Sequence, residues 1–318
     1  MSANLPSAPL TRFAPSPTGY LHLGHVVNAA WTWGTAHALR GKVLLRIEDH
    51  DRTRCRPAYE DAILDDLDWL GLEPDIAPAD EFRGGPSRFR QSDSSAHYEA
   101  ALAALRDAGL AYVCACSRKD IAAEVPDQVN EEMRYPGTCR EHGLEPGPGR
   151  GWRVVMAEGI EAFDDLRLGP ERQSPTEQCG DLLVRDRLGN WTYQFAVTVD
   201  DMRHGIELVV RGEDLLASTG RQIRLARLLG RAEPPRFLHH PLIRKASGAK
   251  LSKANRDTGI RELRAAGISP AEVLGRAAAL GGLEHSVRAV SPNELPALAA
   301  RVLGMQGSGA SRTERRSG

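Results

Sequence analysis

The feature that most constrains the fold of this chain is a strand-to-helix junction near its N-terminus. Residues 10–14 form a short extended run, and residues 26–39 carry apolar side chains at helical spacing. The sequence His22-Leu23-Gly24-His25 lies between them, where the predicted helix begins. A helix N-terminus presents unpaired N–H groups and the positive end of a dipole, and both attract anions. Two imidazoles and a glycine at this position therefore predict a binding site for the triphosphate of ATP.

A second motif, Lys250-Leu251-Ser252-Lys253-Ala254, places two lysines three positions apart in a loop. Paired lysines in a loop can neutralise charge that develops on transferring phosphates, and they need no proton transfer to do so. Histidine pairs and lysine pairs are common on protein surfaces, so each motif alone is a weak signal. Their occurrence together, in this order, indicates that the chain activates a substrate with ATP.

Composition places the chain among ordinary globular proteins. Hydrophobic residues make up 41% of its 318 residues and charged residues 26%. A net charge of -1 does not indicate binding to nucleic acid, so any RNA contact must come from a local basic patch. No apolar stretch is long enough to span a membrane, residues 1–9 lack the pattern of a signal peptide, and five cysteines do not suggest a disulfide framework. We expect a cytoplasmic monomer without a membrane partner.

The apolar residues alternate between strand and helix patterns. Residues 42–47 read as a buried strand that ends at acidic residues, and residues 58–70 carry apolar side chains at helical spacing. This order predicts an α/β fold with a Rossmann-like, doubly wound parallel sheet. Further strands are predicted at residues 191–199, 207–210 and 236–243, and further helices at 95–107, 215–229, 270–280 and 293–303.

Residues 111–150 differ in amino-acid composition from the rest of the chain. They contain three cysteines, scattered charges and the sequence Glu145-Pro146-Gly147-Pro148-Gly149, which suits an insertion that projects from a sheet. The last residues are rich in Gly, Ser and Arg, a composition typical of disorder. The predicted organisation is a first half of the catalytic domain at 9–110, a zinc-bearing insertion at 111–150, a second half with the lysine loop at 151–260, a short helical extension at 261–304 and a disordered tail at 305–318.

Five polar residues fall at the ends of predicted strands, where open α/β sheets bind their ligands: Arg12, Ser16, Glu48, Tyr193 and Arg211. Guanidinium groups pair with carboxylates through two hydrogen bonds, so two arginines here suit a substrate that carries a carboxylate. A glutamate side chain suits the ammonium group of an amino acid. For any one of these residues alone, an ion pair that stabilises the sheet is an equally good interpretation.

Three longer sequences accompany the two motifs: Arg12-Phe13-Ala14-Pro15-Ser16-Pro17-Thr18-Gly19, Arg46-Ile47-Glu48-Asp49 and Val210-Arg211-Gly212-Glu213-Asp214. Together they resemble the glutamate-specific branch of the class I aminoacyl-tRNA synthetases, over residues 11–255. The resemblance implies formation of glutamyl-adenylate from L-glutamate and ATP, with Mg²⁺ bound to ATP. It assigns catalysis to His22, His25, Lys250 and Lys253, ATP binding to His22, Gly24, His25 and Lys253, and glutamate binding to Arg12, Ser16, Glu48, Tyr193 and Arg211.

Length separates two kinds of enzyme within this branch. Residues 255–318 are too few for the large helical anticodon-binding region that full-length glutamyl members carry after the lysine loop. The chain therefore resembles the shorter members, which activate glutamate without tRNA and transfer it to the queuosine base at the first anticodon position of tRNA(Asp). Val197 supports this, because full-length members tend to have Asn there. Two alternatives stay open: a compact enzyme that charges the tRNA 3′ end, and a non-catalytic module that binds adenylate or RNA.

The cysteines of the insertion predict a metal site. Cys114, Cys116 and Cys139 offer soft thiolates at a spacing that suits one Zn²⁺ per chain. Three unligated thiols in a small subdomain are the alternative. For the fourth ligand, spacing alone selects His142, whereas the family resemblance points to Tyr135, which we prefer. Two further cysteines, at positions 55 and 179, read as ordinary free thiols.

Overall fold

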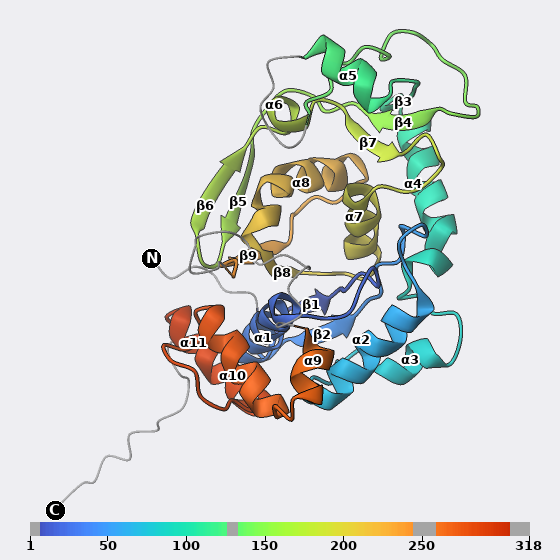
Figure 1. Ribbon diagram of the computed structural model, residues 1–318. Helices are drawn as coiled ribbons and strands as arrows, with labels where there is room; N and C mark the ends of the chain where they lie inside the picture. The colour runs from blue at the N-terminus through green and yellow to red at the C-terminus, as the bar shows by residue number, and fades with distance from the viewer. Residues whose placement is uncertain (1–6, 126–132, 244–258, 306–318) are drawn as a thin grey trace, which may run out of the picture.

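The computed structural model describes residues 7–125, 133–243 and 259–305. Its N-terminal part is a strand–helix–strand unit in which β1 (Leu10–Phe13) and β2 (Lys42–Leu45) pair in parallel and α1 (Leu23–Ala38) connects them (Figure 1). β2 is buried after its first residue, as expected for a parallel strand that is covered on both faces. α1 buries most of its side chains because it contacts these strands and also the C-terminal helices.

A second sheet continues this unit. β8 (Leu208–Gly212) and β9 (Arg236–His240) pair in parallel along their whole lengths. β9 also pairs with β5 (Glu161–Asp165), which forms an antiparallel hairpin with β6 (Gly169–Gln173). The expected α/β fold is therefore confirmed, whereas the expectation of a purely parallel sheet is wrong. The connection between β5 and β6 is too short for the crossover that a parallel pair requires, so the sheet is mixed.

β1 lies beside β8, which brings the two halves of the catalytic domain together. The backbone N–H of Glu207 donates to the carbonyl oxygen of Leu10 at 2.9 Å. Further along the same strands, Arg12 Nη1 donates to the carbonyl oxygen of Val210 at 3.4 Å. The C-terminal ends of β1, β8 and β9 therefore open at the same edge, where ligands bind in open α/β folds.

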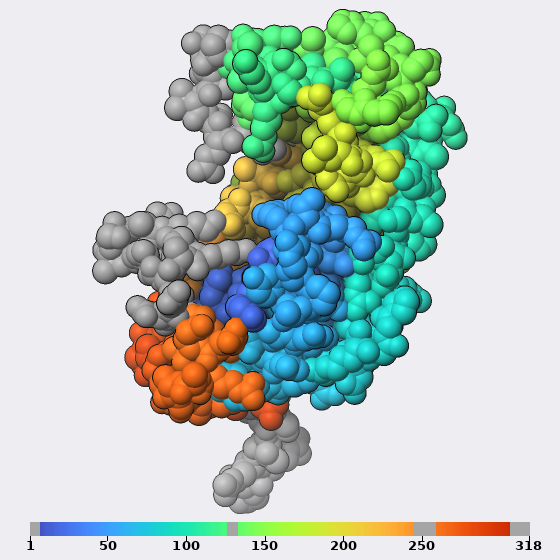
Figure 2. Space-filling model, turned by 45° about the vertical axis from the view of Figure 1, so that its right-hand side comes forward, coloured from blue at the N-terminus to red at the C-terminus, as the bar shows by residue number. Residues whose placement is uncertain are grey.

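The insertion contributes a separate antiparallel sheet. Its order is β3 (Ala111–Cys114), β4 (Gly151–Val154) and β7 (Leu182–Arg185), so the predicted boundary at residue 150 falls within this sheet. Two short helices accompany it, α5 (Arg118–Glu124) and α6 (Pro175–Cys179). The molecule is hollowed between this part, in green, and the N-terminal helices, in blue (Figure 2).

The predicted strand at residues 191–199 is wrong, because this segment begins α7 (Tyr193–Arg203). Every residue from Phe195 to Asp201 is buried. A short apolar run fits a buried strand and a buried helix equally well, and periodicity alone does not separate them. Packing against α4 and α8 settles the choice in favour of a helix.

The remaining helices surround these sheets. They are α2 (Pro57–Leu70), α3 (Ala79–Arg83), α4 (Ser95–Asp107), α8 (Thr219–Leu228), α9 (Ile260–Ala265), α10 (Pro270–Leu280) and α11 (Leu295–Val302), with short 3₁₀ turns η1 (Gln91–Ser94), η2 (Glu213–Ser218) and η4 (Pro292–Glu294).

The C-terminal helices pack directly on α1. Trp31 Nε1 donates to the carbonyl oxygen of Gly281 at 2.9 Å. Gly34 permits the close approach of α11, because a Cβ at this position would lie 2.9 Å from the carbonyl oxygen of Leu295. None of the helices in the described ranges has the length and apolar character that a membrane crossing requires. Of the predicted tail at 305–318, all but the first residue lies outside the described residues.

Candidate active site

The histidine motif forms the N-terminal cap of α1. His22 is the N-cap residue, and its Nδ1 accepts from the backbone N–H of Gly24 at 3.0 Å. In return, His25 Nδ1 accepts from the backbone N–H of His22 at 3.1 Å. Because both Nδ1 atoms accept, each neutral ring carries its proton on Nε2. The motif therefore supplies two imidazole donors, with ring centroids 4.0 Å apart, beside a helix N-terminus.

Gly24 is required by this capping arrangement. A Cβ on Gly24 would lie 2.8 Å from His22 Cε1 and 3.0 Å from His22 Nδ1, closer than side chains normally approach. The imidazole of His22 therefore lies against a bare backbone. Any larger residue at this position would displace the ring from its capping position.

A cavity of about 330 Å³ opens in front of the motif, within the size range of small-ligand sites. Its lining comes from α1, from the end of β8 with η2, and from the end of β9. The lining residues are His22, Gly24, His25, Val27, Asn28, Arg211, Gly212, Asp214, Leu215, His240, Pro241, Leu242 and Ile243. The histidine motif, predicted to bind phosphate, and one predicted substrate arginine therefore face the same space.

The lysine motif lies outside the described residues, so Lys250 and Lys253 are not placed. The segments on either side of it are described; the preceding one lines the cavity, and the following one pairs with the histidine motif. Ile243 lines the cavity, and Gly259 forms an isolated antiparallel bridge with His22. The backbone N–H of Ile260 also donates to the carbonyl oxygen of Leu21 at 3.0 Å.

Arg211 is a buried cation whose hydrogen-bond partners are all neutral. It donates from Nη1 to Gln222 Oε1 at 2.7 Å, from Nη2 to Thr219 Oγ1 at 2.7 Å and from Nε to His239 Nε2 at 3.0 Å. Only 3% of its surface is exposed, and burial lowers its pKa. Among the described residues it forms no ion pair. A buried charge without a counter-ion is costly, so this guanidinium is suited to receive an anionic ligand.

Tyr193 begins α7 beside this arginine. Burial, and then the negative charge of Glu48, raise the pKa of the Tyr193 phenol, and the charge of Arg211 acts on it in the opposite direction. The phenol therefore stays protonated and can donate a hydrogen bond. Tyr193 starts a helix and not the predicted strand. It nevertheless lies close enough to Glu48 and Arg211 for their charges to act on its phenol, as the sequence predicts for residues that share a pocket.

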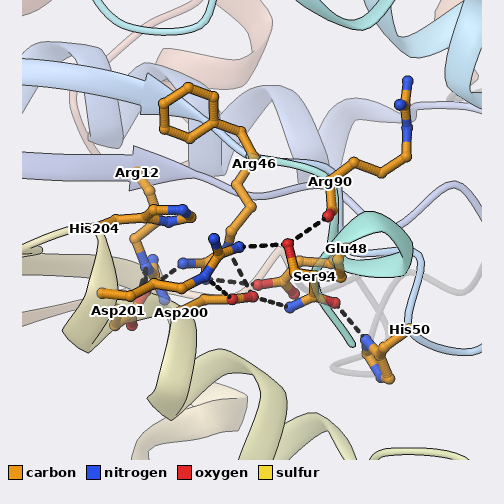
Figure 3. Close-up of polar contacts among 12 residues, drawn as sticks. Arg12, Arg46, Glu48, His50, Arg90, Ser94, Asp200, Asp201 and His204 are labelled. Carbon is orange, nitrogen blue, oxygen red and sulfur yellow. Dashed lines mark hydrogen bonds and ion pairs between the residues drawn. The ribbon is translucent and has the colours of Figure 1, made fainter. Parts of the chain in front are cut away.

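A buried network of ions joins Arg12, Arg46 and Glu48 to two acids of α7 (Figure 3). Arg12 Nε donates to Asp201 Oδ1 at 3.0 Å, and Arg46 donates to Asp201 Oδ1 at 2.7 Å and to Glu48 Oε1 at 2.8 Å. Arg46 also lies 3.9 Å from Asp200. Burial opposes ionisation of Asp201, yet Arg12 and Arg46 hold its pKa below the ordinary value.

This network distinguishes the two predicted substrate arginines. The charge of Arg12 is shared with Asp201, whereas Arg211 has only neutral partners. Sequence reasoning did not single out Asp200, Asp201 or Arg46 as members of the site. The signal that could have found the two acids is their place directly after an apolar run, where ionised side chains need buried partners.

Ser16 lies at the start of the same site, between β1 and the histidine motif. Its Oγ is 3.9 Å from Cys55 Sγ, and burial raises the pKa of the Cys55 thiol. Cys55 is therefore a protonated neighbour of Ser16 and not an isolated surface thiol.

The insertion gathers four potential metal ligands. The Sγ atoms of Cys114, Cys116 and Cys139 lie within 4.8 Å of one another. The Tyr135 hydroxyl lies 3.4 Å from Cys114 Sγ and 3.7 Å from Cys116 Sγ. Ligands of a tetrahedral Zn²⁺ lie roughly 3.5–3.8 Å apart, given Zn–S and Zn–O bond lengths. His142 is exposed and does not belong to this group among the described residues.

The chemistry of this group fits a cation. Burial and the Cys139 thiol raise the pKa of Cys116 to about 12, and burial with the Cys114 thiol raises that of Tyr135. Burial acts to raise the pKa of the Cys139 thiol, but hydrogen bonds from the backbone N–H of Ala115 and from the Tyr135 hydroxyl outweigh it and lower this pKa. A lowered pKa favours the thiolate, the form that binds a divalent ion. Arg153 stacks on the Tyr135 ring at 3.6 Å and donates from Nε to Cys114 Sγ at 3.3 Å, which would balance negative charge on the ligands.

Comparison with known proteins identifies the family. The family described as "tRNA synthetases class I (E and Q), catalytic domain" matches residues 10–290. The chain belongs to this family, and it is a ligase of the aminoacyl-tRNA synthetase type. The resemblance drawn from the motifs is therefore confirmed.

Curated relatives narrow the similarity to one kind of synthetase. The chain is 41% identical over 283 residues to the "Glutamyl-Q tRNA(Asp) synthetase" of Nitratidesulfovibrio vulgaris, covering 86% of each chain. It is 43% identical over 265 residues to the protein of the same name in Burkholderia mallei, covering 82% of this chain and 84% of that one. The corresponding protein of Leptothrix cholodnii is 43% identical over 283 residues, with 86% and 89% covered.

Solved structures agree on the fold. A glutamate tRNA ligase from Elizabethkingia meningosepticum, in complex with its amino acid, superimposes with a TM-score of 0.75 at 28% identity. The match covers 91% of this chain and 64% of the ligase, so the chain spans less than two thirds of the ligase's length. A Mycobacterium tuberculosis methionyl-tRNA synthetase, at a TM-score of 0.50 and 12% identity over 84% of this chain and 63% of that one, shares the fold.

Proposed function

We propose that this chain activates L-glutamate with ATP in the absence of tRNA and then transfers the glutamate to the queuosine base at the first anticodon position of tRNA(Asp). The observation that carries the choice of substrate is the buried cation of Arg211, whose hydrogen-bond partners are all neutral. The name shared by the curated relatives supports the acceptor.

The pocket suits glutamate group by group. The side-chain carboxylate would bind Arg211, with the protonated Tyr193 phenol as a second donor. The carboxylate of Glu48 would receive the α-ammonium group, and Ser16 would donate at the edge of the pocket. This leaves the α-carboxylate directed toward the cavity that the histidine motif lines. Glutamine lacks the anion that Arg211 requires, so the pocket discriminates against it.

Activation requires positioning and electrostatics rather than a base. An oxygen of the glutamate α-carboxylate attacks the α-phosphorus of ATP, the new C–O–P anhydride forms, and pyrophosphate leaves with the electrons of the broken P–O bond. The Nε2–H groups of His22 and His25 would donate to the triphosphate as negative charge develops. Lys250 and Lys253 would add two cations from outside the described residues. Mg²⁺ bound with ATP would offset phosphate charge.

Zinc would have a structural role. Cys114 ends β3, Cys116 follows it, and Tyr135 and Cys139 come from the next described segment. One Zn²⁺ held by these four groups would join the two segments of the insertion. No step of the reaction passes through this site.

The acceptor would enter the hollow between the insertion and the N-terminal helices (Figure 2). A splayed anticodon loop with an unusual base is the kind of RNA feature that proteins recognise specifically. A net charge of -1 suits a small footprint with few phosphate contacts. We expect one chain to be sufficient for this contact.

Pyrophosphate exchange tests the first step. Labelled pyrophosphate should enter ATP when glutamate is present and tRNA is absent, and glutamine should support the exchange far less. Labelled glutamate should then attach to tRNA(Asp) that carries queuosine and not to tRNA(Asp) without it, and the label should survive removal of the 3′-terminal nucleotides. Label on the 3′ end of tRNA(Glu) would instead identify a compact charging enzyme, and absence of exchange both without and with tRNA would identify a binding module.

A further inference from the structure

The orientation of the Gln91 side chain is fixed by Asp200. Gln91 Nε2 donates to Asp200 Oδ2 at 2.7 Å. Asp200 also accepts from Arg203 Nε at 2.7 Å and from the Tyr98 hydroxyl at 3.0 Å, so its carboxylate oxygens act as acceptors. The amide nitrogen of Gln91 must therefore face Asp200, and its oxygen must face the opposite way.

That oxygen determines the tautomer of His50. Gln91 Oε1 lies 2.7 Å from His50 Nδ1, so Nδ1 carries the hydrogen and donates it (Figure 3). In the neutral ring, Nε2 then holds a lone pair. This contact is the only hydrogen bond of His50 among the residues that the structure describes, and the side chain is half-buried. The relay from Asp200 through Gln91 to His50 thus presents a basic nitrogen for which the described residues provide no hydrogen-bond partner.

His50 lies at the edge of the proposed glutamate pocket. It follows Glu48 by two residues, and its ring centroid is 6.3 Å from that of Tyr193. Its neighbours in the sequence include the charged residues Glu48, Asp49, Asp51 and Arg52, and Asp200 of α7 is linked to it through Gln91. No role in activation is needed for this base, because the α-carboxylate attacks as an anion.

The second step differs, because a hydroxyl nucleophile must lose a proton. We propose that His50 is the general base of the transfer step. The acceptor hydroxyl oxygen attacks the carbonyl carbon of glutamyl-adenylate, an ester C–O bond forms, and the bond from that carbon to the phosphate oxygen breaks to release AMP. The hydroxyl proton passes to His50 Nε2 and then to solvent. This inference rests on the proposed function and adds a catalytic residue to it.

His50→Gln separates a basic role from a structural one. The new amide N–H can still donate to Gln91 Oε1, but the amide has no basic nitrogen. Glutamyl-adenylate formed on the enzyme is mixed with queuosine-containing tRNA(Asp), and the single-turnover rate of ester formation is measured beside pyrophosphate exchange. We expect transfer to fall roughly 10²-fold or more, the usual contribution of a general base, and exchange to fall far less.

Two further variants complete the experiment. His50→Ala should lose transfer to the same extent and regain part of it when free imidazole is added. His97→Gln, on the exposed face of α4, should transfer as the unchanged chain does. Full transfer by His50→Gln would overturn the role of His50 while leaving the proposed function intact. Exchange without transfer in the unchanged chain would overturn the proposed acceptor, and the role of His50 with it.

Discussion

The guanidinium of Arg211 and the imidazole of His239 share a hydrogen bond of 3.0 Å whose direction fixes the charge of the histidine. A guanidinium only donates, so His239 Nε2 accepts and the ring proton lies on Nδ1. Asp165 binds that proton at 2.7 Å. His239 is therefore neutral, and the negative charge of Asp165 is separated from Arg211 by one ring. Arg211 is held in position without being neutralised, which leaves its charge available to the carboxylate of the proposed substrate.

Two buried arginines should consequently respond in opposite ways to the same substitution. Arg211→Gln removes a cation whose partners are neutral, so the free energy of unfolding should change little. The KM for glutamate in pyrophosphate exchange should rise at least tenfold, because a charge-assisted hydrogen bond to the substrate is lost. Arg46→Gln should instead destabilise the fold by about 3–5 kcal/mol, because Glu48, Asp200 and Asp201 lose a buried partner.

Urea unfolding and exchange kinetics on both variants check this contrast. If Arg211→Gln unfolds as easily as Arg46→Gln, then Arg211 is a structural ion and the substrate assignment loses its main support.

Gly24→Ala tests whether the capping position of His22 matters for activation. Alanine is favoured in helices, so the free energy of unfolding should change by less than about 1 kcal/mol. The added Cβ would nevertheless lie 2.8 Å from His22 Cε1 and displace the ring. We expect the exchange rate to fall at least tenfold, as for loss of a donor to developing charge. Gly84→Ala is the matched control, because its Cβ would lie 3.5 Å from the nearest atom. Unchanged exchange in Gly24→Ala would exclude a positional role for His22.

Sequence patterns predicted which groups of unusual residues would lie together. A histidine pair at a helix start, three cysteines in an insertion and arginines at strand ends are local patterns, and the structure brings each set together. The helix at α7 was not predictable in this way, because its apolar run is buried on all sides and has no distinguishing period.

The residues that orient the site were also hidden from sequence reasoning. Asp165, His239, Gln91 and Asp200 act through partners that are distant in the chain, and each residue type is common on surfaces. Only the fold reveals that Asp165 faces His239 across β5 and β9, and that Gln91 spans the space between His50 and Asp200.

Metal analysis should find about one zinc per chain. Cys116→Ser should abolish it, because three remaining ligands with one weak oxygen donor do not hold the ion. Tyr135→Phe should weaken zinc retention against a chelator. His142→Ala should retain zinc as the unchanged chain does, because the His142 side chain is exposed and does not belong to the group among the described residues. Loss of zinc in His142→Ala but not in Tyr135→Phe would move the fourth ligand to His142.

Acid should destabilise this protein through buried histidines, and His204 offers the clearest measurement. Burial, with Arg46 and Arg203 nearby, lowers its pKa from 6.5 to about 4. Below pH 6.5 the unfolded chain binds a proton at His204 that the folded chain does not bind. The free energy of unfolding therefore falls as pH falls, by up to about 1.4 kcal/mol per pH unit until pH approaches 4.

His204→Gln keeps a donor for the carbonyl oxygen of Arg88 but does not titrate. The free energy of unfolding of this variant, measured with urea between pH 6 and 4.5, should therefore fall less steeply with falling pH, by about that amount per pH unit. Phe195→Leu, in the core of α7, the helix that His204 follows directly, should lower stability equally at every pH. An identical slope in His204→Gln and the unchanged chain would show that His204 is protonated in the folded state.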